Sequence, residues 1–376
     1  MKKWLVLLLA LALVLAFAAC GPAEDPVVDE PAEPAEPVAE EPAEEGPFVA
    51  LVTDVGNIDD ESFNQACWEA VMQFGDEFGF DYSYYRPSED STEARKVTMS
   101  TAIADGADVI VCPGFLFEEA VYNMQYDNPE VSFLLIDGEP HTADYSVYDT
   151  AANVHCILYQ EEQSGFFAGY AAVMDGFTKL GYVGGMEVPA VQRFGYGFVQ
   201  GADYAAQQLG VNVDVNYWYA GVFAPSDDIY NTSSSWYADG TEVIFACGGG
   251  LYQSVVQAAE EVEGYYVIGV DVDQSYISPT IITSAMKQLK YTTYVSLCDL
   301  KDNEWVWPAD YAAATAKLGA ADNATGIPTE TDSWRFRSFT VDQYNEVLAG
   351  VIDGSIPVSE AIDAMPATTN VTVTVK

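Results

Sequence analysis

The chain is short of basic residues. It has 14 Lys and Arg against 58 Asp and Glu, a formal net charge of −44 at pH 7 over 376 residues. A surface of this sign repels phosphate groups, which excludes nucleic acid and an anionic lipid surface as binding partners. Most of the carboxylates are expected to be solvated, so the charge alone does not identify a ligand.

Residues that bind zinc or act as nucleophiles are also scarce. His141 and His155 are the only imidazoles, the cysteines after Cys20 are odd in number and widely spaced, and no C-x-x-C pair is present. Buried free thiols are the simplest interpretation. We therefore expect no metal site, no cofactor and no catalytic residue. Two glycine clusters, 184–185 and 248–250, fall short of G-x-G-x-x-G, which disfavours dinucleotide binding.

The N-terminus has the features of an export signal. Two lysines precede an apolar run over residues 5–17, which is too short for a membrane-spanning stop-transfer helix. Two alanines then precede Cys20, as in a bacterial lipobox. We predict a signal peptide over residues 1–19 and a lipid on Cys20. An ordinary cleaved signal with a chance cysteine is the alternative.

Residues 20–47 look like a tether. After the cysteine they consist almost wholly of Pro, Ala, Val, Glu and Asp, with no basic residue. Such a stretch buries too little apolar surface to offset the entropy of ordering, so it is expected to be extended and disordered. Together with the lipid, it would hold a globular body at the extracytoplasmic face of the cell membrane.

From residue 48 onward, short apolar strands alternate with amphipathic helices. This alternation is typical of a parallel sheet covered by helices on both faces. The rhythm restarts after residue 160, and a body of roughly 330 residues exceeds what one hydrophobic core supports, so two α/β lobes are predicted. The predicted strands are 48–53, 81–85, 109–112 and 132–136 in the first lobe, and 179–183, 211–219, 243–246 and 266–270 in the second.

The lobes are predicted to divide the chain unequally. Residues 48–157 together with about 286–376 are assigned to the first lobe, and residues 158–285 to the second. The part after about residue 300 is harder to interpret. It holds three candidate strands that cross between or flank the lobes, at 305–308, 334–339 and 371–376.

Ligands of open α/β sheets bind beyond the carboxyl ends of the strands, so the residues there are candidates for a site. Asp54 follows the first strand, and Phe63 and Asn64 begin the next helix. Capping of that helix by Asp60 or Ser62 accounts for the acidic cluster nearby. A calcium loop is a further alternative, although the spacing of an EF-hand is absent.

Two more carboxylates end buried strands. Asp137 follows 132–136 and Asp271 follows 266–270. A carboxylate in such a place is costly unless it is paired with donors, and helix N-termini or ligand hydroxyls are natural partners. A pair of carboxylates in one cleft also raises the alternative of a glycosidase.

Three residues of the second half complete the candidates. Phe223 lies in a turn-rich loop after a strand, Phe194 is near the start of a helix, and Lys287 stands out because lysine is so scarce. Core packing is the alternative for both phenylalanines, and a surface charge is the alternative for the lysine.

The motifs around these residues form a combination seen in one family. They are DVGNIDDESFNQ at 54–65, GGMEVPAVQRFGYGFVQG at 184–201, GVDVDQ at 269–274 and TSAMK at 283–287. Together they resemble the basic membrane protein family of ABC-transporter substrate-binding lipoproteins, which includes purine nucleoside receptors. The resemblance implies a type I periplasmic-binding-protein fold, with two doubly wound parallel-sheet lobes joined by a hinge.

The resemblance also implies roles for the candidate residues. Phe63 and Phe223 would sandwich the base, with Phe194 a further aromatic candidate. Asn64 and Asp137 would bind the edge of the base. Asp271 and Lys287 would hold the ribose, and Asp54 would line the same cleft.

A monomer that captures a nucleoside and delivers it to an ABC permease is the function that the resemblance implies. Alternatives are a sensory lipoprotein, an extracellular hydrolase and a protein for a non-nucleoside solute. The strong acidity and the segment after Leu300 depart from the family pattern.

Overall fold

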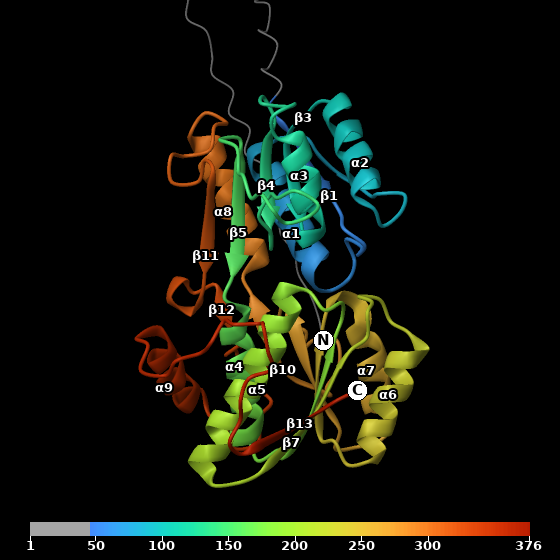
Figure 1. Ribbon diagram of the computed structural model, residues 1–376, viewed down its shortest axis with the longest axis vertical. Helices are drawn as coiled ribbons and strands as arrows, with labels where there is room; N and C mark the ends of the chain where they lie inside the picture. The colour runs from blue at the N-terminus through green and yellow to red at the C-terminus, as the bar shows by residue number, and fades with distance from the viewer. Residues whose placement is uncertain (1–45) are drawn as a thin grey trace, which may run out of the picture. The chain divides into compact units, whose positions relative to one another are not determined.

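Two β-sheets organise residues 46–376, the part of the chain that this computed structural model describes (Figure 1). The predicted signal peptide, the lipidation site Cys20 and nearly all of the tether lie outside the described residues. Within 46–376, no helix is long and apolar enough to cross a membrane.

The first sheet has six parallel strands in the order β11-β5-β4-β3-β1-β2. Their bounds are β1 (Phe48–Val52), β2 (Tyr82–Tyr85), β3 (Ala107–Pro113), β4 (Ser132–Ile136), β5 (Val154–Tyr159) and β11 (Ala314–Leu318). Helices cover both faces: α1 (Phe63–Phe78) and α8 (Leu289–Asp302) on one, α2 (Thr92–Ala104) and α3 (Glu118–Met124) on the other. All residues of β4 are buried because each face has its own core, which explains the continuous apolar strands.

The second sheet has seven strands in the order β12-β10-β9-β8-β6-β7-β13, and only the β10–β12 pair is antiparallel. The strands are β6 (Lys179–Gly184), β7 (Val213–Tyr219), β8 (Val243–Cys247), β9 (Tyr266–Asp271), β10 (Ile281–Lys287), β12 (Thr325–Gly326) and β13 (Val371–Val375). Its helices are α4 (Glu161–Met174), α5 (Pro189–Leu209) and α9 (Val341–Ile352) on one face, and α6 (Asp227–Ala238) and α7 (Tyr252–Glu260) on the other. The predicted two-lobed α/β architecture is confirmed.

The chain crosses between the sheets three times. It passes from β5 into α4, from β10 into α8, and from β11 towards β12. Two bonds hold these crossings together: the Gln160 N–H donates to the Leu318 carbonyl at 2.9 Å, and the Gln288 N–H donates to the Ala324 carbonyl at 2.9 Å. Three adjacent crossings of this kind form a hinge about which two lobes can close.

The last part of the chain does not belong to the lobe that was predicted from the sequence. We expected residues from about 286 to 376 in the first lobe, but β12 and β13 pair with the second sheet. The candidate strand at 371–376 is confirmed as β13, whereas 305–308 and 334–339 are loops. These loops bury apolar side chains without strand pairing, and the indole N–H of Trp334 donates to the Phe339 carbonyl at 2.9 Å.

Four glycines let helices α4 and α5 lie backbone to backbone. They are Gly165 and Gly169 in α4 and Gly197 and Gly201 in α5. A methyl group on Gly169 would lie 2.1 Å from the Phe198 carbonyl oxygen, far inside van der Waals contact. The close approach matters for the site, because it brings Glu161 at the start of α4 next to Arg193 near the start of α5.

We expect Gly169→Ala to lower the free energy of unfolding by about 2 kcal/mol or more, since the added methyl group forces the helices apart. Urea denaturation measures the change. Gly250→Ala is the matched control, because its methyl group would meet its nearest neighbour, Pro225, at an ordinary 3.6 Å. Equal stability of the two variants would contradict the proposed backbone contact.

Candidate ligand-binding site

A cavity of about 340 Å³ lies between the carboxyl ends of the two sheets. All eight side chains selected from the sequence line it: Asp54, Phe63, Asn64 and Asp137 from the first lobe, and Phe194, Phe223, Asp271 and Lys287 from the second. Sites for small ligands range from about 300 to 1,000 Å³, so this one suits a compact molecule.

The loop between β1 and α1 is held in shape by its own polar side chains. Asn64 donates its amide N–H to Asp54 at 2.9 Å and to Asp60 at 3.3 Å. Asp60 also accepts the backbone N–H groups of Asn64 at 3.1 Å and Gln65 at 3.2 Å, which caps α1 as expected. Burial raises the pKa of Asp60 to about 6 although these bonds oppose the shift. Asp54 and Asn64 are thereby fixed at the cavity wall.

Ser62, the other capping candidate, does not cap the helix. Its hydroxyl reaches across to the second lobe and donates to Asp271 at 2.6 Å. The side-chain amide of Gln274 donates to the Glu61 carbonyl at 2.8 Å, a second bond between the lobes. The structure is therefore a closed arrangement, with the β1–α1 loop seated on the strand ends of the second sheet.

Both strand-end carboxylates have an unusual backbone. Asp137 has φ 62° and Asp271 has φ 66°, in the left-handed region that non-glycine residues rarely occupy. A residue in a sparsely populated backbone region costs on the order of 1–3 kcal/mol, which the surrounding structure must offset. The turn in the chain directs both carboxylates towards the same buried ammonium group, that of Lys287.

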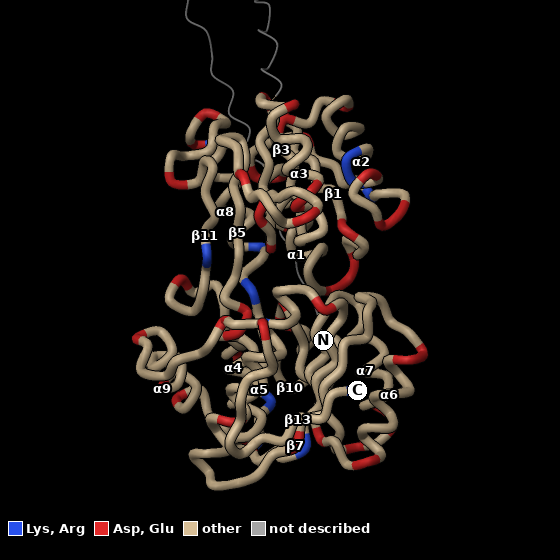
Figure 2. The backbone as a smooth tube through the Cα atoms, in the orientation of Figure 1, with Lys and Arg blue, Asp and Glu red and all other residues tan. Residues whose placement is uncertain are grey.

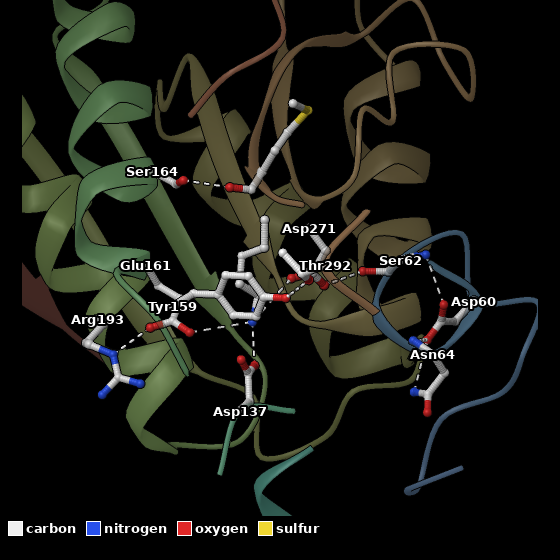
Figure 3. A network of polar contacts seen from close by, with 12 residues as sticks. Asp60, Ser62, Asn64, Asp137, Tyr159, Glu161, Ser164, Arg193, Asp271 and Thr292 are labelled. Atoms are coloured by element: carbon white, nitrogen blue, oxygen red, sulfur yellow. Dashed lines mark hydrogen bonds and ion pairs between the residues drawn. The ribbon is translucent and has the colours of Figure 1, made fainter. Parts of the chain in front are cut away.

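Lys287 is the centre of a buried ionic cluster. Figure 3 labels the other members, Asp137, Glu161, Asp271 and Arg193. Its ammonium pairs with Asp137, and it lies 3.6 Å from Glu161 and 3.9 Å from Asp271. Glu161 in turn accepts from the guanidinium of Arg193 at 2.5 Å. The residues come from both lobes and from two of the three hinge crossings.

The charges of the cluster do not balance. Burial disfavours the ammonium form of Lys287, but Asp137, Glu161 and Asp271 outweigh that effect and raise its pKa. Burial, together with the charges of Glu161 and Asp271, raises the pKa of Asp137 to about 7. Three carboxylates thus share two cations, and one Asp137 oxygen is buried without a hydrogen-bond partner in the described residues. That oxygen is an acceptor free for a ligand.

The two aromatic candidates for a sandwich come from opposite lobes. Phe223 is seated in a slot formed by both glycine clusters: a methyl group on Gly185 would lie 2.3 Å from its ring, and one on Gly248 would lie 2.8 Å away. The Phe63 ring faces the ammonium of Lys287 at 4.8 Å. Phe194 is almost fully buried and lies edge-on to Phe245, with the ring centroids 6.0 Å apart. Most of its side chain therefore packs in the core, which is the alternative given above for this residue.

Several lining residues were not anticipated from the sequence. Arg193 is one of them. Its partner Glu161, which lies behind the wall, was also not anticipated, because strand β5, which precedes it, was itself not predicted. Other unanticipated residues of the cavity wall are Phe115, Glu118, Glu139, Tyr148, Val188 and Ile362. For Glu161 a signal was available: an acidic residue at the start of a helix, one residue after an apolar run.

The cavity wall is strongly acidic. Acidic positions are also much more frequent than basic ones along the described backbone (Figure 2). Six carboxylates line it against two basic residues, Lys287 and Arg193. Within residues 46–376, no three His, Cys, Asp or Glu side chains are grouped to hold a metal ion. Such a wall favours a ligand that donates hydrogen bonds and carries no negative charge.

Comparison with known proteins identifies the family of the chain. Residues 48–352 match the family described as ABC transporter substrate-binding protein PnrA-like. Basic membrane protein B of Borreliella burgdorferi is 28% identical over 294 residues, which span 76% of this chain and 81% of that protein. The ABC transporter nucleoside-binding protein BmpA of Lactococcus lactis is 29% identical over 241 residues, 61% of this chain and 65% of that protein.

A solved structure bears on the fold. The crystal structure of an ABC transporter system solute-binding protein from Aeropyrum pernix has a TM-score of 0.66 and 23% identity, and the match covers 82% of this chain and 86% of that one. The predicted family and fold class are confirmed, and the chain belongs to the PnrA-like family of ABC transporter substrate-binding proteins.

Proposed function

We propose that this chain binds a nucleoside, and specifically a purine nucleoside, in the cavity between its lobes and delivers it to an ABC permease. The observation that carries the proposal is the gathering of two aromatic rings, several carboxylates and one ammonium in a single closed cavity. A relative named as a nucleoside-binding protein supports the ligand class.

The aromatic residues supply the surfaces for a planar base. Phe63 and Phe223 come from different lobes and line the same cavity, so closure would bring their rings onto the two faces of one base. The glycine slot behind Phe223 fixes that ring in place. A base between the rings would join the lobes, so that binding favours the closed state.

The polar residues supply acceptors for the donors of a nucleoside. The unpaired oxygen of Asp137 can accept from the base, and Asn64 lies on the same lobe. Asp271 and Lys287 can bind the hydroxyls of the ribose, one as acceptor and the other as donor. Asp54 lines the same side of the cavity as Asn64.

The anchor completes the proposal. A lipid on Cys20 and the tether of residues 20–47 would hold the body at the outer face of the membrane, within reach of the permease. The hinge crossings would let the open form capture solute and the closed form dock.

Calorimetric titration with purine and pyrimidine nucleosides, free bases and sugars tests the ligand class. We expect purine nucleosides to bind, and binding of a sugar but of no nucleoside would overturn the proposal. A nucleoside 5′-monophosphate is expected to bind roughly 100-fold more weakly than its nucleoside, because its phosphate would face the acidic wall. Equal affinities would show that the carboxylates do not select against charge.

Phe63→Ala should weaken nucleoside binding by about 1–3 kcal/mol, the scale of one lost base–aromatic stack, or roughly 5- to 150-fold in Kd. The measurement is the same titration. Tyr291→Ala is the matched control, because that ring is exposed and does not line the cavity. An unchanged Kd in Phe63→Ala would remove Phe63 from the site.

Asp137→Asn should weaken binding and also change the pH dependence of stability. The folded-state pKa of about 7 lies above the ordinary 3.8, so the folded chain holds this proton more tightly than the unfolded chain does. The wild type should therefore lose stability through this group as pH rises from about 4 to about 7, and the amide variant should not. Chemical denaturation at several pH values measures the difference. Parallel pH profiles for the two proteins would contradict the expected titration of Asp137.

A further inference from the structure

The chain between α9 and β13, residues 353–370, contains no helix or strand. We call it the C-terminal strap; in Figure 1 it is the red trace that leaves α9 and leads to β13. The family match ends at residue 352, so the strap lies beyond the matched part of the chain. A stretch of this length without regular structure keeps one course only where its polar and apolar groups are held.

Polar bonds fix the strap on helix α5. The side-chain amide of Gln200 donates to the Ser359 carbonyl at 2.9 Å and accepts the Ser359 N–H at 2.8 Å. Asp203, which is buried, accepts the three N–H groups of residues 369–371 at 2.9, 2.7 and 3.0 Å. The strap is thus secured in its middle and at the point where β13 begins.

One face of the strap is apolar and packs on the second lobe. The side chains that contact its core cluster are Ile356, Val358, Ile362 and Met365. Ile362 differs from the others because it also lines the ligand cavity, as do residues 188–190 at the start of α5. A side chain from outside the family match therefore forms part of the cavity wall.

The strap also contacts the first lobe. Glu360, two residues before Ile362, forms an ion pair with Lys317 of strand β11. Both side chains are about half exposed, so the pair adds little stability by itself. It places the strap across the junction of the two lobes, next to the cavity that they enclose.

We propose that the C-terminal strap forms one wall of the cavity and that Ile362 limits the size of the ligand and slows its release. The identity of the ligand rests on the proposed function, whereas the position of the wall does not. An aliphatic side chain supplies contact without a hydrogen bond, so it selects by shape.

Substitutions at residue 362 test the wall in both directions. In Ile362→Ala we expect the nucleoside that binds best to the wild-type full-length chain to dissociate roughly tenfold faster, the scale of lost methylene contacts in an apolar pocket. We also expect a benzyl-substituted analogue of that nucleoside to gain affinity relative to its parent. Ile362→Trp should have the reverse effect and exclude the analogue. Stopped-flow fluorescence gives the rates.

Val358→Ala is the matched control. It removes apolar contact from the same strap and the same core cluster, but Val358 does not line the cavity. Its dissociation rate should stay within about twofold of the wild type, as for substitutions away from a site. Equal acceleration in Val358→Ala and Ile362→Ala, or no change in Ile362→Ala, would overturn the assignment of Ile362.

The wild-type titration separates the two proposals. If no nucleoside binds, the proposed ligand is wrong, and a crystal structure of unliganded Ile362→Ala decides on the strap. We then expect the strap to keep its course and the cavity to enlarge at residue 362. A strap displaced from the cavity, or a cavity of unchanged volume, would overturn the inference.

Discussion

The ammonium group of Lys287 is the constraint on which the site depends. It is buried among Asp137, Glu161 and Asp271, which come from both lobes and from a hinge crossing. Breaking a buried ion pair by removing one partner costs about 3–5 kcal/mol, and here three carboxylates share the loss. The left-handed backbone of Asp137 and Asp271 is tolerated because it turns both carboxylates towards this cation. A ligand that reaches the same carboxylates therefore acts where the two lobes meet.

The fold brings this cluster together through an unusually close helix pair. Glycines in α4 and α5 remove the side chains that would separate the helix backbones. Near the N-terminal ends of the two helices, Glu161 of α4 and Arg193 of α5 are then in direct contact, so Glu161 is shared between Arg193 and Lys287. The absence of side chains also shapes the Phe223 slot, where glycines after two strands leave room for an aromatic ring. In both places, glycine acts through close approach rather than through flexibility.

The electrostatics of the cavity follow from this arrangement. Because carboxylates outnumber cations in the wall and in the cluster beneath it, the site is poised to accept hydrogen bonds. In the proposed site, the aromatic rings and Ile362 would add surfaces that discriminate between ligands by shape. Recognition of the proposed ligand would then be divided between polar groups on the central strand ends and apolar groups on the loops and the C-terminal strap.

The strand-end chemistry and the two-lobed fold could be predicted from local sequence patterns. Buried parallel strands are continuous apolar runs, and the residue after each run is known once the run is known, so Asp137 and Asp271 could be found locally. Strand β5 was missed because His155 interrupts its apolar pattern; burial lowers the pKa of that imidazole to about 4, so it sits neutral in the strand. Three features became visible only in the folded chain: Glu161 and Arg193 join Lys287, β12 and β13 belong to the second sheet, and Ile362 reaches the cavity. Those contacts join residues far apart in the chain, and no local periodicity encodes them.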